Sequence, residues 1–309
     1  MSHYKERHIF RECFENFYKS YIPNRHDNLK KIIFKVVYLV AFVTLIVSAV
    51  YIANYYLESD KQNNIIDDSR NVWHSSSAEE TTYVSGDVVK TLLEENSDFK
   101  GWIYIKNAKV DHPIYQTDNN SFYLNHNQSK KSNRYGALFF DCKNIISADN
   151  TSLNLTIYGH NMKNGSMFGT LKKYRDLSFY KENPTFEFST IYKKNTYKIF
   201  SIFVTNSSPA DDNNSVYDYS RQSFLNEIDF NEWLNEAYLR SLINTGVETI
   251  YGDNLITLST CSNDFDNARF VIMAREVREG EEKTVNTKNS VVNPSPKYPK
   301  RWYDDRKID

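Results

Sequence analysis

Two residues in the second half of the chain have side chains that could together carry out acyl transfer. Cys261 ends the apolar run ITLSTC, and a polar turn, SNDFDN, follows it directly. His160 follows a second apolar run, LNLTIYG, and also precedes polar residues. An imidazole within hydrogen-bonding reach of a thiol favours the thiolate and can return a proton to a leaving amine. The two strand ends therefore predict a cysteine nucleophile with a histidine partner, provided that their strands are neighbours.

Arg269 could act beside the nucleophile and the histidine as a third catalytic residue. It opens the apolar run after the cysteine turn, so a short loop would return it beside Cys261 in an antiparallel pair. A guanidinium in that position could stabilise the oxyanion of a tetrahedral intermediate and hold a substrate backbone. Each residue also has an ordinary structural interpretation, as a buried thiol, a hydrogen-bonded histidine or a solvated arginine. The catalytic hypothesis depends on all three side chains converging.

Short β-type runs surround these residues. Seven segments with turn residues at their ends are rich in β-branched and aromatic side chains. They are 101–105, 110–116, 136–141, 153–159, 196–205, 254–261 and 268–277. Such runs, separated by loops, predict a mainly β domain that closes, or nearly closes, into a barrel. Apolar residues at helical spacing in 87–95, 166–180 and 221–243 predict helices, the first with Ser85 as its N-cap.

An uncharged apolar run near the N-terminus predicts a membrane anchor. Val36 to Ala53, extended by apolar neighbours to 32–57, is long enough for a bilayer core of ~30 Å. Lysines precede the run and acidic residues follow it, so the positive-inside rule predicts a cytoplasmic segment 1–31 and an extracellular remainder. A cleaved signal peptide would have a shorter apolar region nearer Met1, and a buried core helix would have a polar face. We therefore favour an uncleaved single-pass anchor.

The rest of the chain divides by composition into three parts. Residues 58–84 are polar, and we expect an extracellular stalk there. Residues 85–278 contain the runs described above and form the predicted catalytic domain. Residues 279–309 are charged, poor in apolar side chains and contain NPSPKYP, so we expect this tail to be disordered.

Charge and cysteine content limit the possible partners. With a net charge of -1, the chain gives no argument for a nucleic-acid partner. An odd, low number of cysteines, Cys13, Cys142 and Cys261, predicts no disulfide framework. No matching histidine or arginine context surrounds Cys142, and we interpret it as a structural thiol.

Three segments carry a resemblance to a known family. TLSTC (257–261) matches the TLxTC signature of sortases, and YGHNMKNGSMFGTLKKY (158–174) resembles the histidine segment of class B sortases. CSNDFDNARFVIMARE (261–276) resembles their cysteine-to-arginine loop and final strand. The resemblance implies a closed, eight-stranded β-barrel with N-terminal helices. It also implies an added long helix between late strands, which we place at 221–243.

The resemblance also implies an activity. Such enzymes recognise an LPxTG- or NPxTN-like sorting signal near the C-terminus of a secreted protein, and the thiolate attacks the carbonyl of the signal's Thr. A thioester forms and is resolved by an amine of a cell-wall precursor or of a pilin lysine. Cys261, His160 and Arg269 would act as nucleophile, acid–base and oxyanion stabiliser, and the chemistry needs no metal or organic cofactor.

Five further residues are candidates for substrate contact. Ser259 and Thr260 adjoin the nucleophile, and Tyr158 shares a strand face with the position two residues later, where His160 stands. Asn120 and Leu124 resemble the family's early substrate-contact segment. Each of the five could equally be a packing residue.

Alternative functions remain open from the sequence. A papain-like protease uses the same two groups, but in the order cysteine before histidine. A non-catalytic, membrane-anchored binding protein would leave Cys261 and His160 far apart. Within the family, a pilin-polymerising enzyme would use the same three residues, and we favour cell-wall anchoring because no lid sequence is evident.

Overall fold

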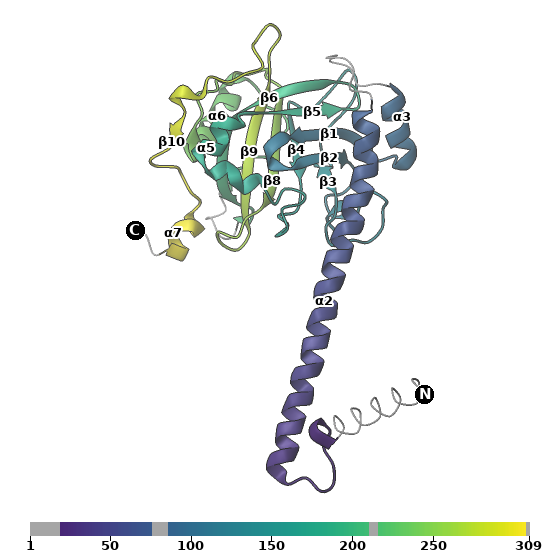
Figure 1. Cartoon of the computed structure of the whole chain (residues 1–309). Coiled ribbons are helices and arrows are strands. Elements are labelled where there is room, and N and C mark those ends of the chain that lie inside the picture. Colours follow the sequence, from purple (N-terminus) through teal and green to yellow (C-terminus); the bar gives the residue numbers. More distant parts are fainter. Residues whose placement is uncertain (1–18, 76–85, 210–215, 307–309) are drawn as a thin grey trace. The chain divides into compact units, whose positions relative to one another are not determined.

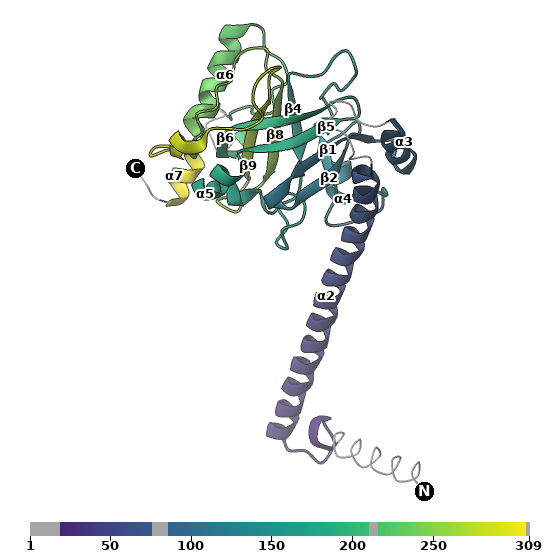
Figure 2. The same ribbon diagram turned by 45° about the horizontal axis from the view of Figure 1, so that its top comes forward.

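The computed structural model describes residues 19–75, 86–209 and 216–306, and the chain forms two compact units, 1–61 and 62–309. Helix α2 (Leu29–His74) contributes residues to both units. Figure 1 shows the elements coloured by their position in the chain, and Figure 2 shows them from a second direction. The two units are described separately below.

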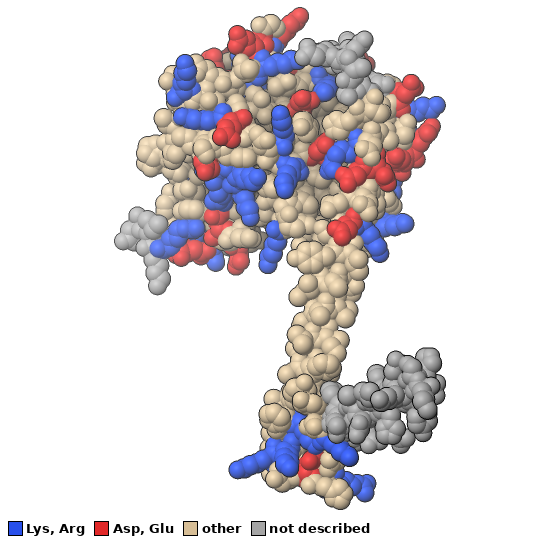
Figure 3. Space-filling model, in the orientation of Figure 1, with Lys and Arg blue, Asp and Glu red and all other residues tan. Residues whose placement is uncertain are grey.

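The N-terminal unit consists mainly of the apolar part of α2. Its large side chains are exposed, among them Val37 and Val47, each 62% accessible. An exposed apolar helix of this length is a candidate membrane span, and α2 is the one such helix within the described ranges. Figure 3 shows its middle as an uncharged surface, with lysines and arginines gathered at its N-terminal end. Lys35 is buried near the start of the helix, where its Nζ donates to Asp27 Oδ2 at 2.7 Å and to two backbone carbonyls.

The second unit is a closed barrel of eight strands in the order β1-β2-β3-β4-β8-β9-β6-β5. Antiparallel pairing of β1 with β5 closes it, which confirms the predicted closed barrel. The strands are β1 (Phe99–Ile105), β2 (Val110–Tyr115), β3 (Leu138–Phe140), β4 (Asn154–Tyr158), β5 (Thr185–Thr190), β6 (Lys194–Asn206), β8 (Leu255–Cys261) and β9 (Ala268–Glu276). Most pairs are antiparallel, but β2 with β3 and β4 with β8 are parallel.

Alternating side chains on these strands build two separate apolar clusters. On β9, Phe270 and Ile272 belong to the larger cluster, whereas Val271 and Met273 point the other way and join the second. This period of two is what a barrel wall requires when it is covered on its outer face. The cover here is α6 (Glu227–Arg240), the added helix between late strands that was expected.

One further helix precedes the first strand of the barrel, and several short helices lie in the connections between strands. They are α3 (Gly86–Glu95), α4 (Phe122–Asn125), the 3₁₀ helices η1 (Lys106–Ala108) and η2 (Leu171–Arg175), and α5 (Leu177–Glu182). The helix predicted at 87–95 is confirmed as α3, whereas its proposed cap Ser85 lies outside the described residues. The helix predicted at 166–180 is divided into η2 and α5. Asp176 divides them because its backbone is extended and its carboxylate caps the N–H of Ser178.

The segment expected to be a stalk is partly structured. Helix α2 continues through residue 74, and its last turns, from Gln62 onward, belong to the barrel unit. Trp73 stacks on Trp102 of β1 with ring centroids 5.0 Å apart, and His74 pairs with Asp111 of β2. Although residues 58–74 are polar on average, one face of this part of α2 is buried, and Ile66 and Trp73 lie on that face two turns apart. Residues 76–84 lie outside the described residues.

The expectation of a disordered tail after residue 278 is wrong for the described residues 279–306. Strand β10 (Val291–Val292) pairs with β7 (Ile243–Asn244), and a short helix, α7 (Lys300–Arg306), follows. Glu281 anchors the start of the tail by accepting hydrogen bonds from Arg275 and Lys198. Disorder was predicted from the low content of apolar residues. In this tail, charged residues with specific partners supply the contacts that apolar residues usually supply.

The hydrogen bonds of Glu281 predict that the free energy of unfolding depends on pH. The Arg275 hydrogen bonds, with smaller contributions from Lys198 and Arg278, hold the pKa of Glu281 well below its usual range. A depressed carboxyl pKa contributes stability above the ordinary pKa and loses it as the pH falls. Glu281→Gln should therefore lower the free energy of unfolding by about 2 kcal/mol at pH 7. The deficit should shrink progressively below about pH 4.

Urea unfolding of the detergent-solubilised chain would measure both effects. Glu282→Gln is the matched control, because Glu282 is exposed and its side chain accepts a hydrogen bond from its near neighbour Thr284. A deficit of equal size in the control, or one that stays constant with pH, would contradict this role of Glu281.

Candidate active site

Parallel pairing of β4 with β8 brings the two predicted strand ends to one edge of the barrel. Tyr158 stands opposite Ser259 in this pair, and Gly159 N–H continues it by donating to the Ser259 carbonyl at 3.2 Å. His160 therefore comes level with Cys261, one strand away. Gly159 is required here, because a Cβ would lie 2.3 Å from Leu138 Cδ2 and 2.8 Å from Phe168.

Antiparallel pairing of β8 with β9 brings Arg269 to the same edge. Cys261 and Arg269 are direct partners in this pair, as the sequence predicted from the short loop between them. Ser262 N–H closes that loop by donating to the Ala268 carbonyl at 2.9 Å. The guanidinium is half-buried, and its Nη1 donates to the Ala268 carbonyl at 3.1 Å. All three predicted catalytic residues therefore meet at one edge.

The two reactive side chains are differently constrained. Cys261 is exposed and carries a free thiol at the end of β8. The ring of His160 is held by Nε2, which lies 2.7 Å from the Leu124 carbonyl oxygen. A neutral histidine that donates through Nε2 keeps Nδ1 as its acceptor. Leu124, predicted as a substrate contact, thus also orients the histidine through its backbone.

Ser259 and a tyrosine missed by the sequence analysis lie just behind the nucleophile. Ser259 is buried and its Oγ donates to the Tyr219 hydroxyl at 3.0 Å. Burial raises the pKa of Tyr219, while the hydrogen bond from Ser259 and the charge of Arg269 act in the opposite direction. Tyr219 lies in the long β6–β8 connection, where no pattern in the sequence marks it as a neighbour of the site.

Tyr158 and Asn120 share a second residue that the sequence analysis did not select, Asp141. The Tyr158 hydroxyl donates to Asp141 Oδ2 at 2.9 Å, and Asn120 Nδ2 donates to the same oxygen at 3.1 Å. Burial raises the pKa of Tyr158 well above its ordinary value, so the phenol remains a donor. Asp141 also lines a groove of about 430 Å³, whose other wall includes Ser220 and Arg221 from the segment that carries Tyr219.

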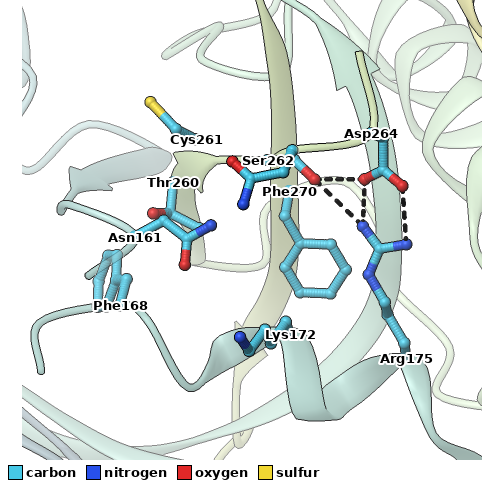
Figure 4. A pocket seen from close by; sticks show the side chains of 10 residues that line it. Asn161, Phe168, Lys172, Arg175, Thr260, Cys261, Ser262, Asp264 and Phe270 are labelled. Atoms are coloured by element: carbon cyan, nitrogen blue, oxygen red, sulfur yellow. Dashed lines mark hydrogen bonds and ion pairs between the residues drawn. The ribbon is translucent and has the colours of Figure 1, made fainter. Parts of the chain in front are cut away.

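Thr260 points to the other side of β8, into a smaller pocket. This pocket of about 220 Å³ runs between Cys261, the loop that follows it and η2 (Figure 4). Thr260 Oγ1 is buried and has no hydrogen-bond partner among the described residues. Asp264, Ser262 and Arg175 form a hydrogen-bonded group on the far wall. Cys261 itself lines this pocket, whereas the groove beside Asp141 is lined by other residues.

Comparison with known proteins agrees with this geometry. A Sortase domain family model matches residues 103–277. The chain is 32% identical over 246 residues to Sortase B of Listeria monocytogenes, covering 76% of this chain and 95% of that protein. It is 30% identical over 191 residues to Sortase B of Staphylococcus aureus, covering 61% of this chain and 74% of that protein.

Solved structures extend the similarity to three dimensions. A Staphylococcus aureus sortase B–substrate complex matches with a TM-score of 0.63 and 26% identity, covering 72% of this chain and 100% of that one. A mutant form of Clostridium perfringens sortase B matches with a TM-score of 0.61 and 30% identity, covering 70% of this chain and 98% of that one.

These findings fit the sortase interpretation better than the papain-like and non-catalytic alternatives. The family model covers more than half of the 309 residues, and the Listeria protein is matched over nearly its whole length. The chain therefore belongs to the sortase family, as a cysteine transpeptidase of the sortase B type.

Proposed function

We propose that Cys261, His160 and Arg269 carry the transpeptidase reaction as nucleophile, acid–base and oxyanion stabiliser. The observation that supports this most directly is the strand register. Cys261 is the direct partner of Arg269 across β8–β9, and the β4–β8 register brings His160 level with it. Three neighbouring strands thus bring nucleophile, proton carrier and cation to one edge, with His160 two residues beyond the end of β4, and acyl transfer requires such proximity.

The first half-reaction follows from these roles. The Cys261 thiolate adds to the threonine carbonyl of the sorting signal, and the Arg269 guanidinium stabilises the oxyanion. The intermediate collapses by breaking the bond between the threonine carbon and the next residue's nitrogen. Protonated His160 gives its proton to that nitrogen, so the C-terminal fragment leaves as an amine and the threonine remains as a thioester.

In the second half-reaction an amine attacks the thioester carbon. Neutral His160 takes the proton from the attacking nitrogen, and the sulfur leaves as thiolate, which restores the starting pair. A solved sortase B structure similar to this chain is complexed with triglycine, which supports an amine acceptor here as well. We propose an amine of the cell-wall precursor, with a pilin lysine as the alternative acceptor.

The groove beside Asp141 is the proposed position for the sorting signal. It lies on the same side of β8 as the Ser259–Tyr219 hydrogen bond, and its polar wall includes Asp218 and Arg221. Tyr158 and Asn120 act there through the Asp141 carboxylate that they share. A groove with paired hydrogen-bonding groups suits an LPxTG- or NPxTN-like signal, which presents backbone amides and a polar threonine.

The proposed location is the cell membrane, with the catalytic domain outside. The apolar part of α2 supports a single span at 32–57, and Lys30 and Lys31 precede it. By the positive-inside rule, residues 1–31 are then cytoplasmic and secreted proteins are the substrates. The proposed substrates and acceptor are both found on that outer side.

The reaction can be tested with quenched peptides that carry LPxTG- and NPxTN-like signals. The full chain in detergent should cleave one of them after Thr and, with an added amine, should form the amide product. Cys261→Ala should abolish both products, because it removes the sulfur that forms the thioester. Cys142→Ser is the matched control and should retain activity. An active Cys261→Ala variant would exclude this mechanism, and polymer formation with a pilin lysine acceptor would instead favour pilus assembly.

The role of Arg269 predicts a loss concentrated in the chemical step. Arg269→Ala should lower kcat by about 10²–10³-fold, as expected for loss of a main oxyanion donor. Arg269→Lys should recover little of this, because an ammonium cannot reproduce the planar fork of the guanidinium. Steady-state kinetics with an unchanged unfolding midpoint would establish the effect. A rise in KM alone would instead give Arg269 a role in binding only.

The proposed topology can be tested in intact cells. Protease added from outside should digest the catalytic domain, whereas a tag placed before residue 19 should be cut only after the membrane is opened. The same chain in inverted vesicles is the control and should show the opposite pattern. Protection of the catalytic domain in intact cells would overturn the topology.

A further inference from the structure

Residues 279–306, called the strap below, continue beyond the residues 103–277 that match the sortase family model. In Figure 1 the strap is the yellow trace that leaves one end of β9, passes β10 and reaches α7. Since Cys261 stands beside the first residues of β9, and the strap follows its last residues, the strap begins at the far end of the barrel.

An ion cluster fixes the strap at this far end. Glu281 accepts from both terminal nitrogens of Arg275 at 2.7 Å and from Lys198 Nζ at 2.7 Å. Arg278 donates to both oxygens of Asp253 at 2.8 Å. Arg275 and Lys198 lie on β9 and β6, so the cluster attaches the start of the strap directly to the barrel wall.

Backbone hydrogen bonds then hold the strap to the last turn of α6 and to the residues that follow it. Asn293 N–H donates to the Leu242 carbonyl at 2.9 Å, and Lys297 N–H donates to the Leu239 carbonyl at 2.8 Å. The side chain of Asn293 adds a bond to the Ser241 carbonyl at 2.8 Å. Because backbone partners are specific in position, the course of the strap is defined over this whole stretch.

The strap ends beside the loop that joins the nucleophile to Arg269. Tyr298 and Trp302 stack with centroids 3.9 Å apart and pack against the main core cluster. The Arg306 guanidinium lies 3.4 Å from the centroid of the Trp302 ring. From there, Arg306 Nη2 reaches to 4.0 Å from Asp264 Oδ1 in that loop.

Asp264 is the residue through which the loop is held. Its side chain is 14% accessible, it forms an ion pair with Arg175, and it accepts from the hydroxyl of Ser262. Figure 4 shows this group on the wall of the pocket beside Cys261. Burial raises the pKa of Tyr298. The charge of Arg175 lowers this pKa and the charge of Asp264 raises it, so Tyr298 is close enough to the ion pair to interact with both charges.

We propose that the strap positions the loop 262–267, and with it Cys261 and Arg269, by holding the Arg306 guanidinium beside Asp264. This inference rests on the proposed roles of those two residues. The loop is the direct link between nucleophile and cation. Arg306 approaches the Asp264 carboxylate, and the Trp302 ring holds the Arg306 guanidinium in that position. Asp264 and the strap residues are positioning residues, since they act through the loop and not on substrate.

The test compares variants of the full chain in detergent. Trp302→Ala removes the ring that holds Arg306 beside the loop, and a chain ending at Lys297 removes Arg306 as well. Both variants retain the ion cluster and β10. Lys297→Ala is the matched control, because it changes a strap residue whose side chain pairs with Glu236 on α6, away from the loop. Transpeptidation kinetics and hydrogen exchange would be measured for each.

Both strap variants should lose at least ~10-fold in kcat, because small displacements of catalytic groups have effects of that size. Exchange should accelerate in residues 262–267 and remain slow in the rest of the barrel, and Lys297→Ala should match the wild type. Unchanged kcat and unchanged loop exchange in both variants would overturn the proposal. Faster exchange throughout the barrel would also overturn it, since the strap would then stabilise the fold as a whole.

The exchange measurement separates this proposal from the proposed function. If the wild-type chain processes no sorting signal, the proposed function fails, and loop exchange alone then decides the positioning role. Local acceleration in 262–267 would uphold that role, and its absence would exclude it.

Discussion

The structure of the site depends on the parallel pairing of β4 with β8. The two strands lie far apart in the chain, yet their register determines which residues meet at the barrel edge. A shift of one residue would turn Ser259 into the core and Thr260 outward, and would separate His160 from Cys261. The tight packing at Gly159 and the interior cluster of Leu155, Ile157, Ile256 and Leu258 hold this register, because a shift would turn these apolar side chains out of the interior.

Two largely buried carboxylates organise the surroundings of the nucleophile. Asp141 gathers Tyr158 and Asn120 on the groove side, and Asp264 gathers Arg175 and Ser262 on the pocket side. A carboxylate in a partly buried place is costly unless donors surround it, and both have them. One network holds residues of the groove, and the other holds the loop that follows Cys261.

The tail and the stalk show why composition was a poor guide outside the barrel. Both segments are polar on average, but each has a few residues in the right places: Ile66 and Trp73 in α2, and Glu281 and Trp302 in the strap. Disorder is predicted from the average content of apolar residues, whereas order follows from particular contacts. An ion cluster, the pairing of β10 with β7, backbone hydrogen bonds to the end of α6 and two aromatic side chains together give the strap a defined course.

The sequence by itself determined the local facts: an apolar run long enough for a membrane, β-type runs, and a nucleophile, a histidine and an arginine each at the end of such a run. These are properties of neighbouring residues, so period and residue type reveal them. Only the tertiary structure decided the partners that come from distant segments. Tyr219 behind Ser259, Asp141 between Tyr158 and Asn120, and the strap against Asp264 depend on how long connections fold back, for which no local pattern exists.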